Sequence, residues 1–308
     1  MINYSIIIPH KNSAALLEYC LSTIPIRDDV QVIVVDDNSD PQKVDFDHFP
    51  KWGGAHYECY FTKERKGAGY ARNIGLEHVQ GKWMLFADAD DYFTLNTNEI
   101  FDKYVDADAD IVFFRTSSVM LFDRKTPSSR ADAFNKRIDR YFQTGDETEL
   151  RVRAFSPWGK LIKRNLIATN NIKFEEIRYS NDNMFAVAIG CFATRICVEN
   201  EYLYVLTEQK ESLCSDYCNK PGELEIRAAA FWRVSQFIQT YHYPIDKDIA
   251  YNFLNMMFVR DHSMYRRYFR EMQKLLGISQ LRMIWEQQER PNTIKRIVYS
   301  AYLFCVLL

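Results

Sequence analysis

The sequence has almost no net charge, no paired cysteine motif and no apolar run of membrane-spanning length. Its 308 residues carry a formal charge of −2, which gives no electrostatic reason to expect a nucleic-acid partner. The seven cysteines include no CxxC pair, so they are interpreted as reduced thiols of a cytoplasmic protein. No apolar stretch approaches the ~20 residues of a membrane-spanning helix. The N-terminal residues lead directly into a strand-like run, so no signal peptide is expected.

The sequence does have enough apolar residues for a large core, since 47% of the chain is hydrophobic. Strand-like and helix-like patterns alternate in its first third. Short apolar runs predict strands at 4–8, 30–35, 57–61 and 83–86. Helical spacing follows Ser13, which can cap a helix, and recurs over 71–79. This alternation predicts a Rossmann-like α/β fold with a mostly parallel central sheet flanked by helices, in which ligands bind at the carboxyl ends of the strands.

These strand ends are unusually acidic. The second predicted strand runs into Asp36 and Asp37, and the fourth runs into Asp88, Asp90 and Asp91. Carboxylates this close raise one another's pKa, unless a cation lies between them. Mg²⁺ and Mn²⁺ prefer carboxylate oxygens and take further ligands from substrate phosphates. We therefore interpret this edge as a site for a divalent cation and a phosphorylated ligand. The alternative for the last three aspartates is an acidic loop that caps the next helix.

Three blocks of the chain resemble family 2 glycosyltransferases. The first block, SIIIPHKNSAALLEYCLSTI followed by VQVIVVDDNSD, resembles the opening of the family. The second, KGAGYARNIGLEHVQGKWMLFADADD, resembles the next family block, which ends in the Asp-x-Asp signature. The third, PWGKLIKRNLIATNNIKFEEIRYSNDNMF, resembles the segment that carries the family's acceptor-side carboxylate. They cover about residues 3–210 in the family's order and spacing. The resemblance implies a GT-A fold and inverting transfer of a sugar from a nucleoside diphosphate sugar, expected to be a UDP-sugar. The implied acceptor is a hydroxyl of a glycan or lipid-linked molecule, as in bacterial capsule, lipopolysaccharide or exopolysaccharide synthesis.

The resemblance also implies a role for each matching position. Asp90 would bind Mn²⁺ or Mg²⁺, and Asp182 would act as the general base that deprotonates the acceptor hydroxyl. Asp37 would accept a hydrogen bond from the nucleotide base, and Asp88 would lie near the ribose. The full set of residues expected to bind donor or acceptor is Pro9, Asn12, Asp37, Gly69, Arg72, Asn73, Asp88, Asp91, Trp158 and Lys160.

Several of these matches have a structural alternative. Asp182 could cap the helix that follows it, and Trp158 with its neighbouring glycine could form a turn. Two positions depart from the common family pattern. Lys11 stands where the family often has tyrosine, and Asn181 stands where it often has glutamate.

The pattern changes after about residue 215, where long helical runs begin. We predict helices over 224–240, 248–259 and 264–276, and a last helix over 292–308. The predicted domains are a catalytic, nucleotide-sugar-binding domain at 1–215 and a helical region at 216–308. The last helix ends in IVYSAYLFCVLL, which is too short to span a bilayer. It could lie on the inner face of the cell membrane, contact a partner or pack against the chain itself.

Two other functions are alternatives to sugar transfer. Sugar-nucleotide nucleotidyltransferases share the α/β architecture, but they usually carry a glycine-rich loop after the first strand, and residues 9–13 contain no glycine. A catalytically silent assembly subunit would have lost the metal-binding or base carboxylate, and both Asp90 and Asp182 are present. The sequence therefore favours a metal-dependent glycosyltransferase.

Overall fold

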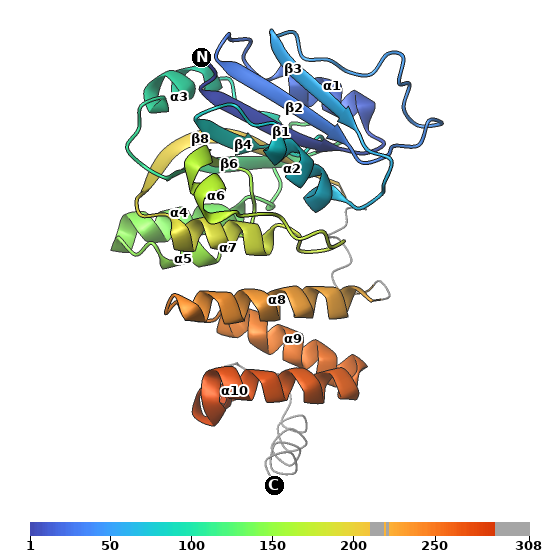
Figure 1. Cartoon of the computed structure of the whole chain (residues 1–308). Coiled ribbons are helices and arrows are strands. Elements are labelled where there is room, and N and C mark those ends of the chain that lie inside the picture. Colours follow the sequence, from blue (N-terminus) through green and yellow to red (C-terminus); the bar gives the residue numbers. More distant parts are fainter. Residues whose placement is uncertain (210–218, 220–221, 287–308) are drawn as a thin grey trace. The chain divides into compact units, whose positions relative to one another are not determined.

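An eight-stranded sheet organises the larger of the two units into which the chain divides (Figure 1). The computed structural model describes residues 1–209, 219 and 222–286. The first unit ends at Pro244, and the second begins at Ile245. The order of strands across the sheet is β3-β2-β1-β4-β7-β6-β8-β5.

The first four strands form a parallel half-sheet, as the apolar runs predict. Its members are β1 (Tyr4–His10), β2 (Val30–Asp36), β3 (His56–Phe61) and β4 (Trp83–Phe86). The other half is mixed and contains β5 (Tyr92–Phe93), β6 (Ile111–Met120), β7 (Lys160–Lys163) and β8 (Ile196–Glu208). Strand β7 runs antiparallel to both of its neighbours, whereas β6 and β8 are parallel to each other. The predicted α/β class with flanking helices is confirmed, and the sheet as a whole is mixed.

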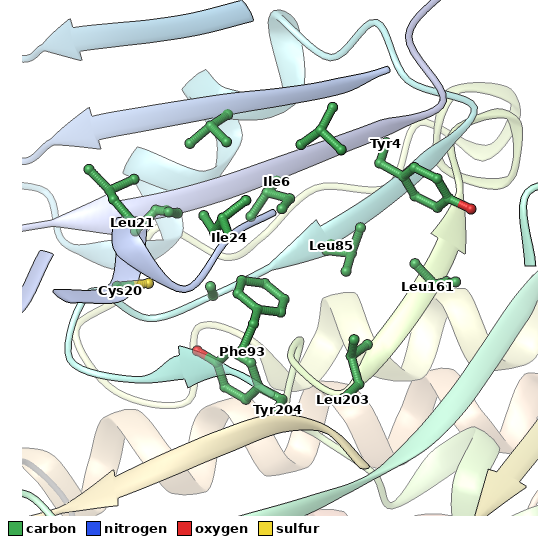
Figure 2. Close-up of a cluster of buried hydrophobic side chains, with 14 of the residues drawn as sticks. Tyr4, Ile6, Cys20, Leu21, Ile24, Leu85, Phe93, Leu161, Leu203 and Tyr204 are labelled. Atoms are coloured by element: carbon green, nitrogen blue, oxygen red, sulfur yellow. The ribbon is translucent and has the colours of Figure 1, made fainter. Parts of the chain in front are cut away.

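Helices cover both faces of the sheet. In the larger unit they are α1 (Ala14–Ser22), α2 (Ala68–Glu77), α3 (Thr97–Tyr104), α4 (Asp132–Thr144), α5 (Thr148–Val152), α6 (Arg164–Asn170), α7 (Asn183–Phe192) and α8 (Glu223–Thr240). Side chains alternate along each strand, so Ile6 and Ile8 enter one buried cluster with residues of α1 and α3, while Ile7 enters a second cluster with residues of α2 and α4–α7. Figure 2 shows part of the first cluster. Two buried layers thus fix the strands whose ends carry the aspartates.

The C-terminal helices agree with the prediction where the structure describes them. Helix α8 matches the predicted 224–240, and the smaller unit contains α9 (Lys247–Arg260) and α10 (His262–Glu286), which pack against each other. In α10, Gly277 interrupts the helical backbone with a φ of 77°. The predicted helix at 292–308 lies outside the described residues. Within the described ranges, no helix is long and apolar enough to cross a membrane.

Ser13 occupies the predicted N-cap position of α1, but its side chain does not form the expected capping hydrogen bond. Its hydroxyl instead donates to the Lys11 carbonyl at 3.2 Å. The Ser13 amide donates to Nε2 of His10 at 3.1 Å. The start of α1 is therefore held by the end of β1.

A tight crossing of α5 and α7 generates a prediction about stability. A Cβ at Gly190 would lie 1.9 Å from the Arg151 carbonyl oxygen, and that carbonyl belongs to backbone that cannot rotate away. The Arg151 guanidinium also donates to the Gly190 carbonyl at 2.8 Å. We expect Gly190→Ala to lower the free energy of unfolding by about 1–3 kcal/mol, measured by urea titration. The control is Gly53→Ala, whose Cβ would meet only the tip of Ile26 at 3.2 Å. Equal stabilities of the two variants would contradict the prediction.

Candidate active site

The polar ends of three neighbouring strands meet at one edge of the sheet, as the sequence predicts. Strand β1 lies between β2 and β4 and is parallel to both. His10 at the end of β1 is in register with Asp36 at the end of β2. The residues that follow β4 include Asp88, Asp90 and Asp91. They do not cap the next helix, because α3 begins at Thr97 with Asn96 at its N-cap, so the capping alternative is wrong.

Asp36 belongs to a buried network that shapes the loops around it. Its carboxylate lies 2.7 Å from Nδ1 of His10 and accepts from the Ser39 hydroxyl at 2.5 Å and the Ser39 amide at 2.8 Å. Since Nε2 of His10 accepts the Ser13 amide, Nδ1 carries the proton and donates it to Asp36. Burial alone would raise the pKa of Asp36, but the bonds from His10 and Ser39 outweigh it and the pKa is lowered. Asp36 is thus an ionised structural carboxylate.

Asp37 connects β2 to the loop before α2. One carboxylate oxygen accepts from the Lys66 amide at 3.0 Å, and the other accepts from the Gly67 amide at 3.0 Å and from the Lys11 ammonium at 2.8 Å. The Asp37 side chain is 3% exposed and that of Lys11 is 40% exposed. Lys11, which stands where the family often has tyrosine, therefore covers the carboxylate from the solvent side.

The other donor-site candidates on β1 lie beside this pair. Pro9 is in register with Val35 within the sheet. Asn12 follows in a left-handed conformation with a φ of 56°. Its amide donates to the Ser39 hydroxyl at 2.8 Å, and its side-chain oxygen accepts the Asp40 amide at 2.8 Å. The structure thus brings these residues together with Asp37 through the loops after β1 and β2.

Arg72 on α2 links two parts of the site that are far apart in the sequence. Its guanidinium donates to Asp88 at 2.6 Å and to the side-chain oxygen of Asn181 at 3.0 Å. Asn181 lies in the α6–α7 loop, residues 171–182, directly before Asp182. The Arg72 side chain is 6% exposed, and its Nε atom has no hydrogen-bond partner among the described residues. This one side chain therefore sets the position of the Asp182 region relative to the end of β4.

Two further residues of α2 fit closely against the α6–α7 loop. The side-chain amide of Asn73 donates to the Phe174 carbonyl at 3.0 Å and accepts the Phe174 amide at 2.8 Å. A Cβ at Gly69 would lie 2.2 Å from the carbonyl oxygen of Glu175, so no side chain fits there. The predicted donor-site residues of α2 thus hold this loop.

Asp90 and Asp182 differ from the other aspartates of the site because neither carboxylate forms a hydrogen bond or ion pair with another described residue. Asp182 occupies the N-cap position of α7 without a capping bond, which removes the support for a purely capping role. Burial raises the pKa of Asp182, and the positive charge of Arg72 opposes this effect. Burial and the nearby charge of Asp88 raise the pKa of Asp90. Both carboxylates are half-buried and available to a ligand.

Asp91 has partners that the sequence analysis did not identify. Its Oδ1 accepts the Thr207 amide at 2.7 Å, whereas its Oδ2 is buried without a partner among the described residues. The Arg130 guanidinium lies 4.0 Å from Oδ1 and donates to the Thr207 carbonyl. Burial and the charge of Asp90 raise the pKa of Asp91. On the other side of Asp90, the Asp88 amide donates to the Tyr204 hydroxyl at 2.7 Å.

The donor set around Asp90 fits a hard divalent cation. Among the described residues, no other side chain pairs with the Asp90 carboxylate, and Oδ2 of the next residue, Asp91, is buried without a hydrogen-bond partner. Carboxylate oxygens are the ligands that Mg²⁺ and Mn²⁺ prefer. In the described part of the chain, no cluster of three or more His, Cys, Asp or Glu side chains could hold a metal ion. A cation here would therefore need further oxygen ligands from water or a bound substrate.

Trp158 packs against Tyr204, whereas the Lys160 ammonium lies over the rings of Phe113 and Phe134. The half-buried Trp158 ring is stacked with Tyr204 at 6.3 Å between centroids. The Lys160 ammonium is buried and donates to the carbonyls of Ala154 and Ser156, both at 2.7 Å. It therefore faces backbone oxygens rather than solvent. Burial lowers the pKa of Lys160 to about 7, although the charge of Asp182 acts in the opposite direction.

A model of glycosyl transferase family 2 matches residues 5–169, more than half of the chain. Among curated proteins, the chain is 24% identical over 237 residues to the poly(ribitol-phosphate) beta-N-acetylglucosaminyltransferase TarS of Staphylococcus aureus, covering 73% of this chain and 39% of TarS. It is 23% identical over 256 residues to the glycosyltransferase GlyA of Streptococcus pneumoniae, covering 80% of this chain and 36% of GlyA. The chain thus matches less than half the length of either relative.

Among solved structures, S. aureus TarS 1–349 in complex with UDP-GlcNAc is similar to this chain with a TM-score of 0.60. The sequences are 19% identical, and the match covers 89% of this chain and 80% of that chain. The complex of TarS 1–349 with UDP has a TM-score of 0.56 at 21% identity, covering 85% and 73% of the two chains. The likeness concerns the fold, and the predicted GT-A architecture is confirmed.

The buried Lys160 generates a prediction about pH. Its folded-state pKa of about 7 lies below its ordinary value of 10.5, so between these values the unfolded chain holds a proton that the folded chain does not. This group therefore makes the free energy of unfolding rise with pH above about 7, by at most about 1.4 kcal/mol per unit. Below that pH its contribution is constant. Lys160→Met should remove the rise, measured by urea unfolding at about pH 6.5 and about pH 9. Identical pH dependence of both proteins would contradict the prediction.

Proposed function

The chain belongs to glycosyl transferase family 2, as its sequence blocks predict, and on this basis we propose that it transfers a sugar from a UDP-sugar to a hydroxyl of a glycan or lipid-linked acceptor. One observation carries the proposal beyond family membership. Among the described residues, Asp90 and Asp182 are the two acidic side chains of the site that form no hydrogen bond or ion pair with another residue. Arg72 binds Asp88, which is close to Asp90 in the sequence, and Asn181, which directly precedes Asp182. Metal-dependent inverting transfer uses a carboxylate that holds the cation at the leaving group and a second one that acts as a base at the acceptor.

Asp90 and Asp91 are the proposed ligands of Mn²⁺ or Mg²⁺. A bound cation supplies Lewis acidity that stabilises the negative charge of the leaving diphosphate. The protein residues prepare the site for it, because the Thr207 amide fixes Asp91 while its Oδ2 stays unpaired. No group of three or more His, Cys, Asp or Glu side chains in the described part of the chain could hold a metal ion, so the proposed cation would share its ligands with the donor or with water.

Asp182 is the proposed general base. It takes the proton from the acceptor hydroxyl while the oxygen forms a bond to the anomeric carbon and the bond to the diphosphate breaks. Attack from the face opposite the leaving group inverts that carbon. Burial raises the pKa of Asp182 and makes it a better proton acceptor, while the nearby Arg72 favours the ionised form. The rate should therefore fall as the pH decreases through the pKa of this carboxyl.

Asp37 is the proposed residue for recognition of the nucleotide base. Two of its partners are the backbone amides of Lys66 and Gly67. The third is the ammonium of Lys11, whose side chain is 40% exposed. A base N–H can approach the carboxylate where this lysine now lies. Pro9 and Asn12 border the same position through the loops after β1 and β2.

The wider role that we propose is synthesis of a bacterial surface polysaccharide or related glycan. TarS is named a poly(ribitol-phosphate) beta-N-acetylglucosaminyltransferase, and it was solved with UDP-GlcNAc. Use of a nucleotide sugar is in keeping with a cytoplasmic location. Peripheral contact with the membrane through 292–308 stays a proposal, since that segment lies outside the described residues.

The first test concerns the base. Asp182→Asn keeps the size of the side chain but removes its basicity, so kcat should fall by at least ~10²-fold while UDP affinity hardly changes. Release of UDP from a panel of UDP-sugars that starts with UDP-GlcNAc measures turnover, and calorimetry measures UDP binding. The matched control is Asp37→Ala, which should chiefly weaken UDP binding, by about 1–3 kcal/mol. Near wild-type turnover of Asp182→Asn would refute its role as the base.

The second test concerns the cation. Calorimetry of UDP should show tighter binding with Mn²⁺ than without metal, because the ion joins the diphosphate to the carboxylates. Asp90→Asn should abolish this metal-dependent gain and leave metal-free UDP binding unchanged. Asp106→Asn serves as the control, since Asp106 is exposed and pairs with Lys82 at the surface. If Asp90→Asn kept the full metal dependence, Asp90 would not be a ligand.

A further inference from the structure

The α6–α7 loop that carries Asp182 is held from two sides. On one side, Arg72 and Asn73 of α2 bind Asn181 and Phe174. Within the loop, the Glu175 amide donates to the Asn181 carbonyl at 3.1 Å, which joins Glu175 to the residue before Asp182. Any element that fixes Glu175 therefore acts on the backbone that leads to Asp182.

Helix α8 supplies the contacts on the second side. The guanidinium of Arg233 donates to the Glu175 carboxylate at 2.6 Å. One turn and a half earlier in the helix, Arg227 lies 4.9 Å from the centre of the Tyr179 ring and 3.5 Å from the Ser180 hydroxyl. Ser180 has a φ of 57°, a left-handed conformation that is unfavourable for serine. Helix α8 thus contacts the loop at Glu175 and again at Tyr179 and Ser180, close to Asp182.

We propose that Arg233 of α8, supported by Arg227, is a positioning residue that orders the α6–α7 loop and thereby places Asp182 for proton abstraction. This inference rests on the proposed function, because it assumes that Asp182 is the base.

The charges of Arg233 and Glu175 agree with a positioning role for Arg233. The second carboxylate oxygen of Glu175 is buried without a partner in the described chain, so Arg233 is the cation that compensates this half-buried charge. Helix α8 also lies beyond residues 5–169, the part that the family model matches.

The Arg233–Glu175 pair suits a test by substitution. Its side chains are 41% and 20% exposed, and pairs of this kind contribute little to stability, so Arg233→Met should fold. Arg227 is less suitable, because it also pairs with the fully buried Glu223 at 2.7 Å. Arg233→Lys keeps the charge and serves as the conservative variant. Gln236→Met, at an exposed position of the same helix, is the matched control.

We expect Arg233→Met to lower kcat about tenfold, because a displacement of about 1 Å at a catalytic group can cost ~10²-fold. Affinity for UDP should stay within about twofold of wild type, since Arg233 itself contacts none of the proposed donor-binding residues and Arg72 and Asn73 keep their own bonds to the loop. A looser loop exposes Asp182 to water and lowers its pKa, so the acidic limb of the kcat profile should move to lower pH. Arg233→Lys should recover most of the rate, and Gln236→Met should match wild type.

A double-mutant cycle decides whether the effect passes through the base. In the Asp182→Asn background, Arg233→Met should reduce the residual rate less than about twofold, because there is no longer a base to position. Wild-type kcat in Arg233→Met, or a full tenfold loss in both backgrounds, would overturn the inference. An equal loss of kcat and UDP affinity would also overturn it, because that result indicates general damage.

Amide hydrogen exchange separates this inference from the proposed function. It requires no sugar transfer, and residues 174–182 should exchange faster in Arg233→Met than in Gln236→Met or wild type. Unchanged exchange would refute the ordering of the loop even if the enzyme is active. Absence of transfer by the wild-type protein would instead refute the proposed function, and the exchange rates would still show whether α8 orders the loop.

Discussion

The buried guanidinium of Arg72 is the interaction on which the geometry of the site depends. It connects Asp88, at the end of β4, to Asn181, which is separated from it by more than ninety positions of the chain. A buried cation needs compensation, and Asp88 provides a full charge while Asn181 provides only a neutral oxygen. Part of the positive charge therefore acts on the adjacent Asp182 and favours its ionised form. A carboxylate at position 181 would take up that charge, so the departure from the common family residue has a direct electrostatic consequence.

The same reasoning divides the aspartates of the site by their partners. Asp36 and Asp37 accept several hydrogen bonds each and shape the loops, so their charges are already compensated. Asp90 is half-buried, unpaired within the described residues and close to Asp88, which raises its pKa. Such an arrangement costs folding free energy, and proteins accept that cost at functional sites. Asp91 shares a property with each kind of aspartate. One of its oxygens accepts the Thr207 amide, and the other has no partner among the described residues.

The parallel half of the sheet and the helices α8–α10 could be predicted from the sequence because their signals are local. Apolar runs between polar ends mark β1, β2 and β4, and helical spacing marks the later segments. The mixed half could not be predicted in this way. Strand β7 has four residues, and it enters the sheet between β4 and β6 through pairings with distant segments. Strand pairing of this kind depends on the fold as a whole, and no short pattern encodes it.

The site follows the same division between local and distant information. Asp90 and Asp182 could be identified from short motifs, yet the properties that distinguish them come from residues far away in the chain. Thr207 follows Asp91 by 116 positions, and Arg72 reaches across 109 positions to Asn181. No spacing rule connects such partners, because the fold decides which donor meets which carboxylate. The contacts of each carboxylate, rather than the motif that contains it, therefore distinguish the aspartates that hold the loops from those that no other described residue pairs with.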